Sequence, residues 1–158
     1  MHVRGVGPIE AGMSIKEAER AGGVRIEVTE FDTFGGRCYY ATAVGFPDLD
    51  FLVQAPGDRA PTDPKDGLIA SVTAANAGWR TPSGAHIGMS DAEIRRLYPD
   101  RLRRDGHQYR EEGFHLTFEP VTAQDRPFGL RFEFGDGKVV DLIHSGDADV
   151  ITYPEGCA

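Results

Sequence analysis

The side chains that could carry acid–base chemistry or hold a metal ion are scattered along this sequence. None of the five histidines forms an HxH or HExxH pair, and the two cysteines lie far apart. The spacing therefore predicts no metal site and no cofactor. The five histidines are His2, His86, His107, His115 and His144. Of these, His86 and His144 are each expected at the surface or at the end of a strand.

Catalysis could arise only from residues that are distant in sequence. The fold could bring His86 and His144 together with an aspartate, which leaves a small hydrolase-like enzyme with a dispersed His/Asp site as an alternative function. The sequence contains no Gly-x-Ser-x-Gly elbow, the motif that presents a nucleophilic serine in many hydrolases. No catalytic residue is assigned from the sequence.

The stretch GPIEAGMS, residues 7–14, has the glycine spacing of a phosphate-binding loop but carries Met13 where that loop needs lysine. The same Gly-Met-Ser triplet occurs again at residues 88–90. In both copies a glutamate follows the serine by three residues, which is the capping-box pattern that begins a helix. We therefore interpret Ser14 with Glu17, and Ser90 with Glu93, as structural helix caps rather than as a nucleotide site.

The segments that follow the two caps also correspond. A helical pattern comes first in each half, and an Asp-Gly turn later leads into a strand-like run, LIASV in the first half and KVVDL in the second. The arginine-rich residues 95–104 are interpreted as the solvated end of the second helix. Strands are expected at residues 24–31, 37–44, 51–54 and 68–74, and again at 107–112, 114–119, 130–134 and 138–145.

This pattern predicts an α+β fold of two tandem repeats. Each repeat would contain a short strand, a capped helix and an antiparallel sheet of about four strands. The first repeat is predicted at residues 1–76, a linker at 77–84, and the second repeat with a C-terminal tail at 85–158. The two repeats could also form one continuous domain.

The composition is that of a globular protein, with 40% hydrophobic residues among 158 and a net charge of −8. An acidic chain of this kind disfavours nucleic acid as a partner. The sequence has no apolar run of the ~20 residues that a membrane-spanning helix needs. We therefore expect neither nucleic-acid binding nor a transmembrane segment.

The two cysteines are predicted to form a disulfide that ties the C-terminal tail to the sheet. Cys38 lies in a predicted strand and Cys157 lies in the tail. Two unpaired thiols are the alternative, because two cysteines define no disulfide framework. Since disulfides persist in oxidising compartments, we expect a periplasmic or extracellular protein whose leader has been removed, with a cytoplasmic location as the alternative.

The motif Gly-Met-Ser-x-x-Glu, opening a helix ahead of a small antiparallel sheet, resembles the small lipoproteins of outer-membrane β-barrel assembly, which have the SmpA/OmlA-like fold. A tandem pair with this spacing resembles the architecture of the β-lactamase inhibitory proteins, which are secreted two-repeat binders. The segments WRTPSG and YPEGCA are similar to parts of secreted bacterial proteins with the same plan. The resemblance covers about residues 6–152 and implies a protein partner, whose identity it does not give.

Aromatic side chains are the candidates for contact with such a partner. Tyr39 and Tyr40 are neighbours on one predicted strand, so one of them must face the core and the other the open sheet face. Tyrosine and tryptophan are frequent anchors of protein interfaces. We expect a non-catalytic, exported or envelope-associated protein-binding module of inhibitor-like character. Its predicted partner-binding residues are Tyr39, Trp79, Tyr109 and His115.

Overall fold

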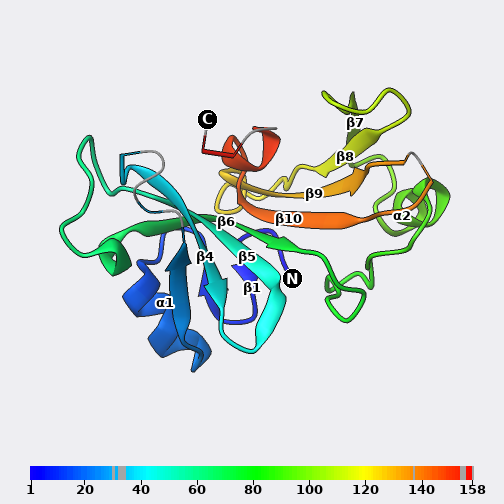
Figure 1. Ribbon diagram of the computed structural model, residues 1–158. Coiled ribbons are helices and arrows are strands. Elements are labelled where there is room, and N and C mark those ends of the chain that lie inside the picture. The colour runs from blue at the N-terminus through cyan, green and yellow to red at the C-terminus, as the bar shows by residue number, and fades with distance from the viewer. Residues whose placement is uncertain (30, 32–34, 137, 154–155, 158) are drawn as a thin grey trace.

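The computed structural model describes residues 1–29, 31, 35–136, 138–153 and 156–157 (Figure 1). Within these residues the protein is mostly β, with an eight-stranded antiparallel sheet, a two-stranded sheet and only two short α-helices. The expectation of an α+β fold is therefore wrong. The helices are α1 (Ile15–Gly22) and α2 (Asp91–Leu97). The strands are β1 (Gly5–Val6), β2 (Ile9–Glu10), β3 (Ile26–Thr29), β4 (Cys38–Ala43), β5 (Phe46–Gln54), β6 (Leu68–Ala74), β7 (Leu102–Gly106), β8 (Phe114–Phe118), β9 (Phe128–Phe134) and β10 (Leu142–Asp147).

The strands of the large sheet follow the order β3-β4-β5-β6-β10-β9-β8-β7. Strands β3 to β6 are connected in succession, as are β7 to β10, and the two groups join where β6 pairs with β10. A sheet of about four strands was expected in each repeat, and the two groups of four strands share one hydrogen-bonded sheet. The division into residues 1–76, 77–84 and 85–158 stays a prediction.

The two Gly-Met-Ser segments make the same backbone contacts in each half of the chain. Gly12 donates to the carbonyl of Ile69 at 2.8 Å, and Gly88 donates to the carbonyl of Val140 at 2.8 Å. Both glycines have a φ of +91°, a conformation that favours glycine. The glycine of the triplet therefore serves a turn between a helix start and a strand.

Both helices begin with a capping box. Glu17 accepts hydrogen bonds from the backbone N–H and the hydroxyl of Ser14, each at 2.8 Å. Glu93 accepts the same pair from Ser90, at 2.8 and 2.7 Å. These contacts satisfy backbone donors that the first turn of a helix leaves unpaired.

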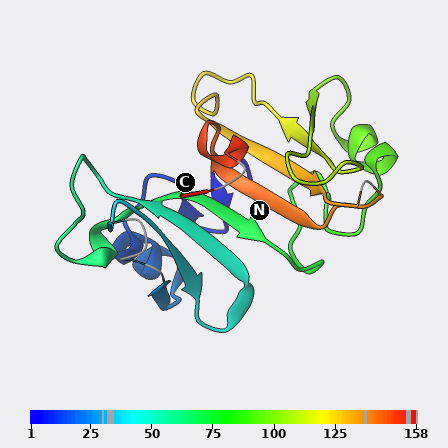
Figure 2. The same ribbon diagram turned by 45° about the horizontal axis from the view of Figure 1, so that its top comes forward.

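One face of the large sheet carries the hydrophobic core. Ile15 and Ala18 of α1 and Ile94 of α2 are fully buried in the same cluster as Phe51 and Phe132 of the sheet. The C-terminal segment lies on the side of the sheet away from α1, as the two views show (Figures 1 and 2). The second face carries a smaller apolar cluster of Leu52, Ala70, Val150 and Cys157, with polar side chains beside it.

The strand at the outer edge of the sheet, in the second half of the chain, is not the one expected. Residues 107–112 were predicted to form a strand, but the edge strand is β7 (Leu102–Gly106). Arg103 and Arg104 therefore lie on a strand, whereas only Arg95 and Arg96 belong to the last turn of α2. A tight turn separates the two elements, with Asp100 at a φ of +56° directly after Pro99.

The predicted disulfide between Cys38 and Cys157 is present. It fastens the C-terminal segment, including the 3₁₀ turn η2 (Val150–Thr152), to strand β4. A second 3₁₀ turn, η1 (Pro64–Asp66), precedes β6. In the part of the chain that the structure describes, neither helix is long and apolar enough to cross a membrane.

Candidate functional site: a groove on the open sheet face

A row of polar residues in register crosses the sheet. Alternate residues of a strand point to the same face, and directly paired residues of neighbouring strands lie side by side. The pairing places one polar residue of each strand in a single line on the face opposite the core. From β7 to β3 the row is Arg103, Thr117, Arg131, His144, Thr73, Asp50, Thr42 and Glu27.

A groove of about 710 Å³ lies over the middle of this row. Its floor is formed by β4, β5, β6, β8, β9 and β10, and one wall is the C-terminal segment with Ile151 and Tyr153. That segment packs closely because Gly129 has no side chain: a Cβ there would lie 2.9 Å from Cδ1 of Ile151. The tail thus covers part of the open face, and within the polar row Thr117 and Arg131 are buried.

Glu133, on β9, is surrounded by three histidines. Nε2 of His107 lies 3.0 Å from Oε1, while Nε2 of His144 and Nε2 of His115 lie 3.2 and 3.7 Å from Oε2. The imidazoles of His115 and His144, together with that of His107, hold the pKa of Glu133 far below its ordinary value. Burial acts in the opposite direction but is outweighed. Glu133 is therefore a carboxylate at neutral pH.

Hydrogen bonding fixes the orientation of two of these histidines. Nδ1 of His107 accepts from the backbone N–H of Tyr109 at 3.1 Å, so Nε2 carries the proton that points at Glu133. Nδ1 of His144 lies 3.0 Å from the hydroxyl of Thr73, which forms a chain from Thr73 through His144 to Glu133.

His115 is held differently. It is only 5% exposed, and its Nδ1 has no hydrogen-bond partner among the described residues. Its ring stacks on that of His107, with centroids 4.9 Å apart and planes 20° from parallel. The 3.7 Å between its Nε2 and Glu133 exceeds a hydrogen bond. Nε2 is nevertheless within ion-pair distance of Glu133, so among the described residues the buried Nδ1 is the ring atom without a partner.

The charges in the groove are arranged by side. Arg131 is buried, with its pKa lowered by that burial, and Nη1 donates to the carbonyl of Ile151 at 3.3 Å. Arg110, at the same side, is largely exposed and lies 3.8 Å from Asp141. Asp50 lies across the groove on β5, where desolvation and the neighbouring Asp48 raise its pKa. The β9 side thus carries two arginines beside the carboxylates of Glu133 and Asp141, whereas the β5 side carries the carboxyl of Asp50.

The structure brings two of the four predicted partner-binding residues to the groove. Tyr109 lines it and is 58% exposed, and His115 lies in its floor. Tyr39 is fully buried in the core, so Tyr40 is the tyrosine of β4 on the open face. Trp79 packs against Phe46, 5.8 Å between ring centroids, away from the groove lining.

The alternative in which His86 and His144 meet is not realised in the groove. His86 is not among the lining residues, and its Nδ1 lies 2.8 Å from the carbonyl of Ile87. The sequence reasoning missed Glu133 and Arg131, although both lie in the alternating stretch LRFEF. Alternation placed them on the polar face, but only the pairing of β8, β9 and β10 shows which histidines they meet.

Comparison of this chain with models of protein families, with curated proteins and with solved structures finds no match.

Proposed function

We propose that this protein is a non-catalytic binding module whose groove takes up a segment of a partner protein. The observation that carries the proposal is the open polar face. Eight strands present it, neither α-helix packs on it among the described residues, and a groove of about 710 Å³ crosses it. Exposed Tyr109 and Tyr153 line that groove, and tyrosines at such positions anchor many interfaces.

The charges of the groove specify the chemistry of the segment. A partner side chain with a carboxylate would lie toward Arg110 and Arg131, and a basic side chain would lie toward Asp50. Complementary charge of this kind sets the orientation of a bound segment and excludes others. The Cys38–Cys157 disulfide supports a location in an oxidising compartment, and we propose the periplasm or the cell exterior.

The proposal is tested by selecting short peptides from a displayed random library against the oxidised protein. Peptides that carry one acidic and one basic residue are expected. Tyr153→Ala should weaken their binding at least about tenfold, the loss typical of an interface anchor. Val121→Ala is the matched control, because Val121 and Tyr153 are both 63% exposed and only Tyr153 lines the groove.

A charge exchange provides the second arm of this test. Asp50→Lys together with Arg110→Glu should reject the first peptides and select ones with the acidic and basic residues in reversed order. Peptides that bind both variants as tightly as the original protein would place the interface elsewhere and refute the proposal.

Hydrolysis is a second candidate function, which one observation favours. In the chain Thr73–His144–Glu133, the histidine could accept the threonine proton while the carboxylate holds the ring, as in a nucleophile–base–acid arrangement. Turnover of simple esters or amides that disappears in Thr73→Val and persists in Thr73→Ser would support it. Absence of turnover in the original protein would leave binding as the function.

A further inference from the structure

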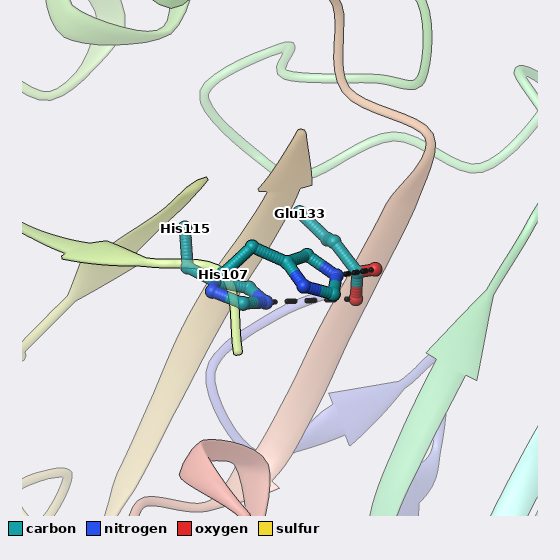
Figure 3. A group of neighbouring side chains, drawn as sticks. All are labelled: His107, His115 and Glu133. Atoms are coloured by element: carbon teal, nitrogen blue, oxygen red, sulfur yellow. Dashed lines mark hydrogen bonds and ion pairs between the residues drawn. The ribbon is translucent and has the colours of Figure 1, made fainter. Parts of the chain in front are cut away.

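The side chains of His107, His115 and Glu133 point toward one another (Figure 3), and all three line the groove. His115 on β8 is paired directly with Glu133 on β9, so their side chains share a face. His107 follows β7 immediately, and its backbone N–H donates to the carbonyl of Gly113 at 3.0 Å, which closes the β7–β8 hairpin. The fold thus unites residues that the sequence spacing kept apart.

The spacing of these donors suits a metal ion. One ligand atom from each of His107, His115 and Glu133 lies within 4.8 Å of the other two. In a tetrahedral zinc site with metal–ligand bonds of about 2.0–2.1 Å, neighbouring ligand atoms are about 3.4 Å apart. Nε2 of His107 lies 3.0 Å from Oε1 of Glu133 and Nε2 of His115 lies 3.7 Å from Oε2, so the two imidazoles approach different oxygens of one carboxylate, at distances on either side of that value.

Hydrogen bonding within the protein explains part of this cluster but not His115. His107 and His144 each have a partner on both ring nitrogens. His115 is buried, its Nδ1 lacks a partner among the described residues, and its Nε2 lies too far from Glu133 for a hydrogen bond. A metal ion between the three groups would bind Nε2 of His115, which now has only the 3.7 Å ion-pair contact with Glu133 among the described residues, and would leave the ring proton on Nδ1.

We propose that His107, His115 and Glu133 bind a divalent transition-metal ion of the zinc class. Two imidazoles and one carboxylate suit Zn²⁺, Co²⁺ or Ni²⁺, whereas Ca²⁺ and Mg²⁺ require more oxygen ligands. His144 acts as a positioning residue: Thr73 holds its Nδ1, and its Nε2 contacts Oε2 of Glu133. Such contacts orient the ligands of many metal sites. The remaining coordination position is available to water.

Metal binding has a defined consequence for His107. A metal bound at Nε2 displaces the proton from that atom, so the neutral ring carries its proton on Nδ1. Nδ1 can then no longer accept from the backbone N–H of Tyr109, whose nitrogen lies 3.1 Å away. The turn at residues 107–110 must therefore rearrange, and the backbone amide of Tyr109 reports on the ion.

The test is titration of the tag-free, oxidised protein with Zn²⁺ and Co²⁺ after removal of trace metal. We expect saturable binding of one ion per chain and the visible absorption of four-coordinate Co²⁺. NMR should show the His107 proton moving from Nε2 to Nδ1 together with a shift of the Tyr109 amide. Ca²⁺ should produce neither change.

Variants separate this site from other histidines. His115→Gln and Glu133→Gln should each weaken Co²⁺ binding by at least about tenfold, the effect seen when even outer ligands of a metal site are removed. His86→Gln is the matched control, because His86 lies outside the groove lining, and it should bind like the original protein. Melting curves establish that each variant is folded, and any variant that is not is replaced by His107→Gln.

The outcomes are distinct. Lack of binding at one ion per chain, or binding that the folded cluster variants leave unchanged, would overturn the metal site. The inference does not rest on the proposed binding function, because peptide binding is measured in chelator and metal binding without peptide. Failure to detect peptide binding would therefore leave the metal site supported, and failure to detect metal binding would leave the peptide-binding function supported.

Discussion

The hydroxyl of Tyr39 occupies the space beside Gly67 where any larger residue would place its Cβ. A Cβ on Gly67 would fall far inside van der Waals contact with the Tyr39 hydroxyl and 2.8 Å from Cγ1 of Val53. The same hydroxyl donates to the carbonyl of Pro64, at the start of η1. One buried phenol thus fixes how the loop before β6 packs on the sheet.

Gly67→Ala should therefore destabilise the protein by overpacking. Insertions into a well-packed site typically cost about 1–3 kcal/mol. Gly57→Ala is the control, because no atom lies within 4 Å of a Cβ there, and it should change the free energy of unfolding little. Urea unfolding of both variants measures the difference, and equal stability of the two would contradict this packing account.

Alkaline pH should weaken the fold through Tyr39. Burial raises the pKa of Tyr39 to about 12 from its ordinary value of 10.0. Because the folded state then holds the proton more tightly than the unfolded chain, this contribution is complete below about pH 10 and is lost as pH rises through about 12. The slope is at most about 1.4 kcal/mol per pH unit for one proton. Unfolding curves of Tyr39→Phe across that window should lack this component.

The two capping serines should contribute to stability and not to chemistry. Ser14→Ala and Ser90→Ala are each expected to lower the free energy of unfolding by about 1 kcal/mol. The larger loss is expected at Ser14, whose hydroxyl also accepts from the backbone N–H of Glu17 at 3.2 Å. A variant that loses a measurable activity while its unfolding curve is unchanged would show that the serine is a nucleophile instead.

Acid should weaken the same caps. Hydrogen bonds from the Ser14 backbone and hydroxyl hold the pKa of Glu17 below its ordinary value, and Ser90 does the same for Glu93. The contribution is present above the ordinary glutamate pKa and is lost as pH falls through the lowered values of the folded state. The stability difference between the original protein and Glu17→Gln should therefore narrow on acidification.

Removal of the disulfide should cost more than any of these substitutions. Cys38 and Cys157 are 119 residues apart, and a closed loop of that length is worth about 5 kcal/mol in the chain-entropy model. Unfolding of a Cys38→Ser, Cys157→Ser variant measures the loss, and mass measurement after alkylation, with and without reduction, verifies the bond. A loss below about 1 kcal/mol would mean that the tail is held by its packing alone.

Local features could be predicted from the sequence because local contacts determine them. The capping boxes need only residues three apart, and the Cys38–Cys157 bond followed from the only two cysteines present. Strand β7 was missed because LRRDG lies at the edge of the sheet, where most of its side chains are exposed and no apolar alternation marks it. Its arginines were therefore assigned to the end of a helix.

The sequence could also have predicted which tyrosine of β4 faces the core. Tyr39 shares a face with Ala41 and Ala43, whereas Tyr40 shares one with Thr42, so alternation already favoured Tyr39 as the core residue. The site around Glu133 was beyond such reasoning. His107, His115 and His144 come from three places in the chain, and only the pairing order of β7 to β10 brings them to one carboxylate.

The junction of β6 with β10 has a kinetic consequence. One edge of β6 pairs with β10, as Ala74 does with Ile143. Because β10 is the last of the eight strands in chain order, this edge stays unpaired until the rest of the sheet has been synthesised. During synthesis the first four strands therefore present an open, largely apolar edge, the kind of surface through which chains aggregate or exchange strands. Pairing between residues so distant in sequence is slow, so the pairing of β6 with β10 should limit the rate of folding.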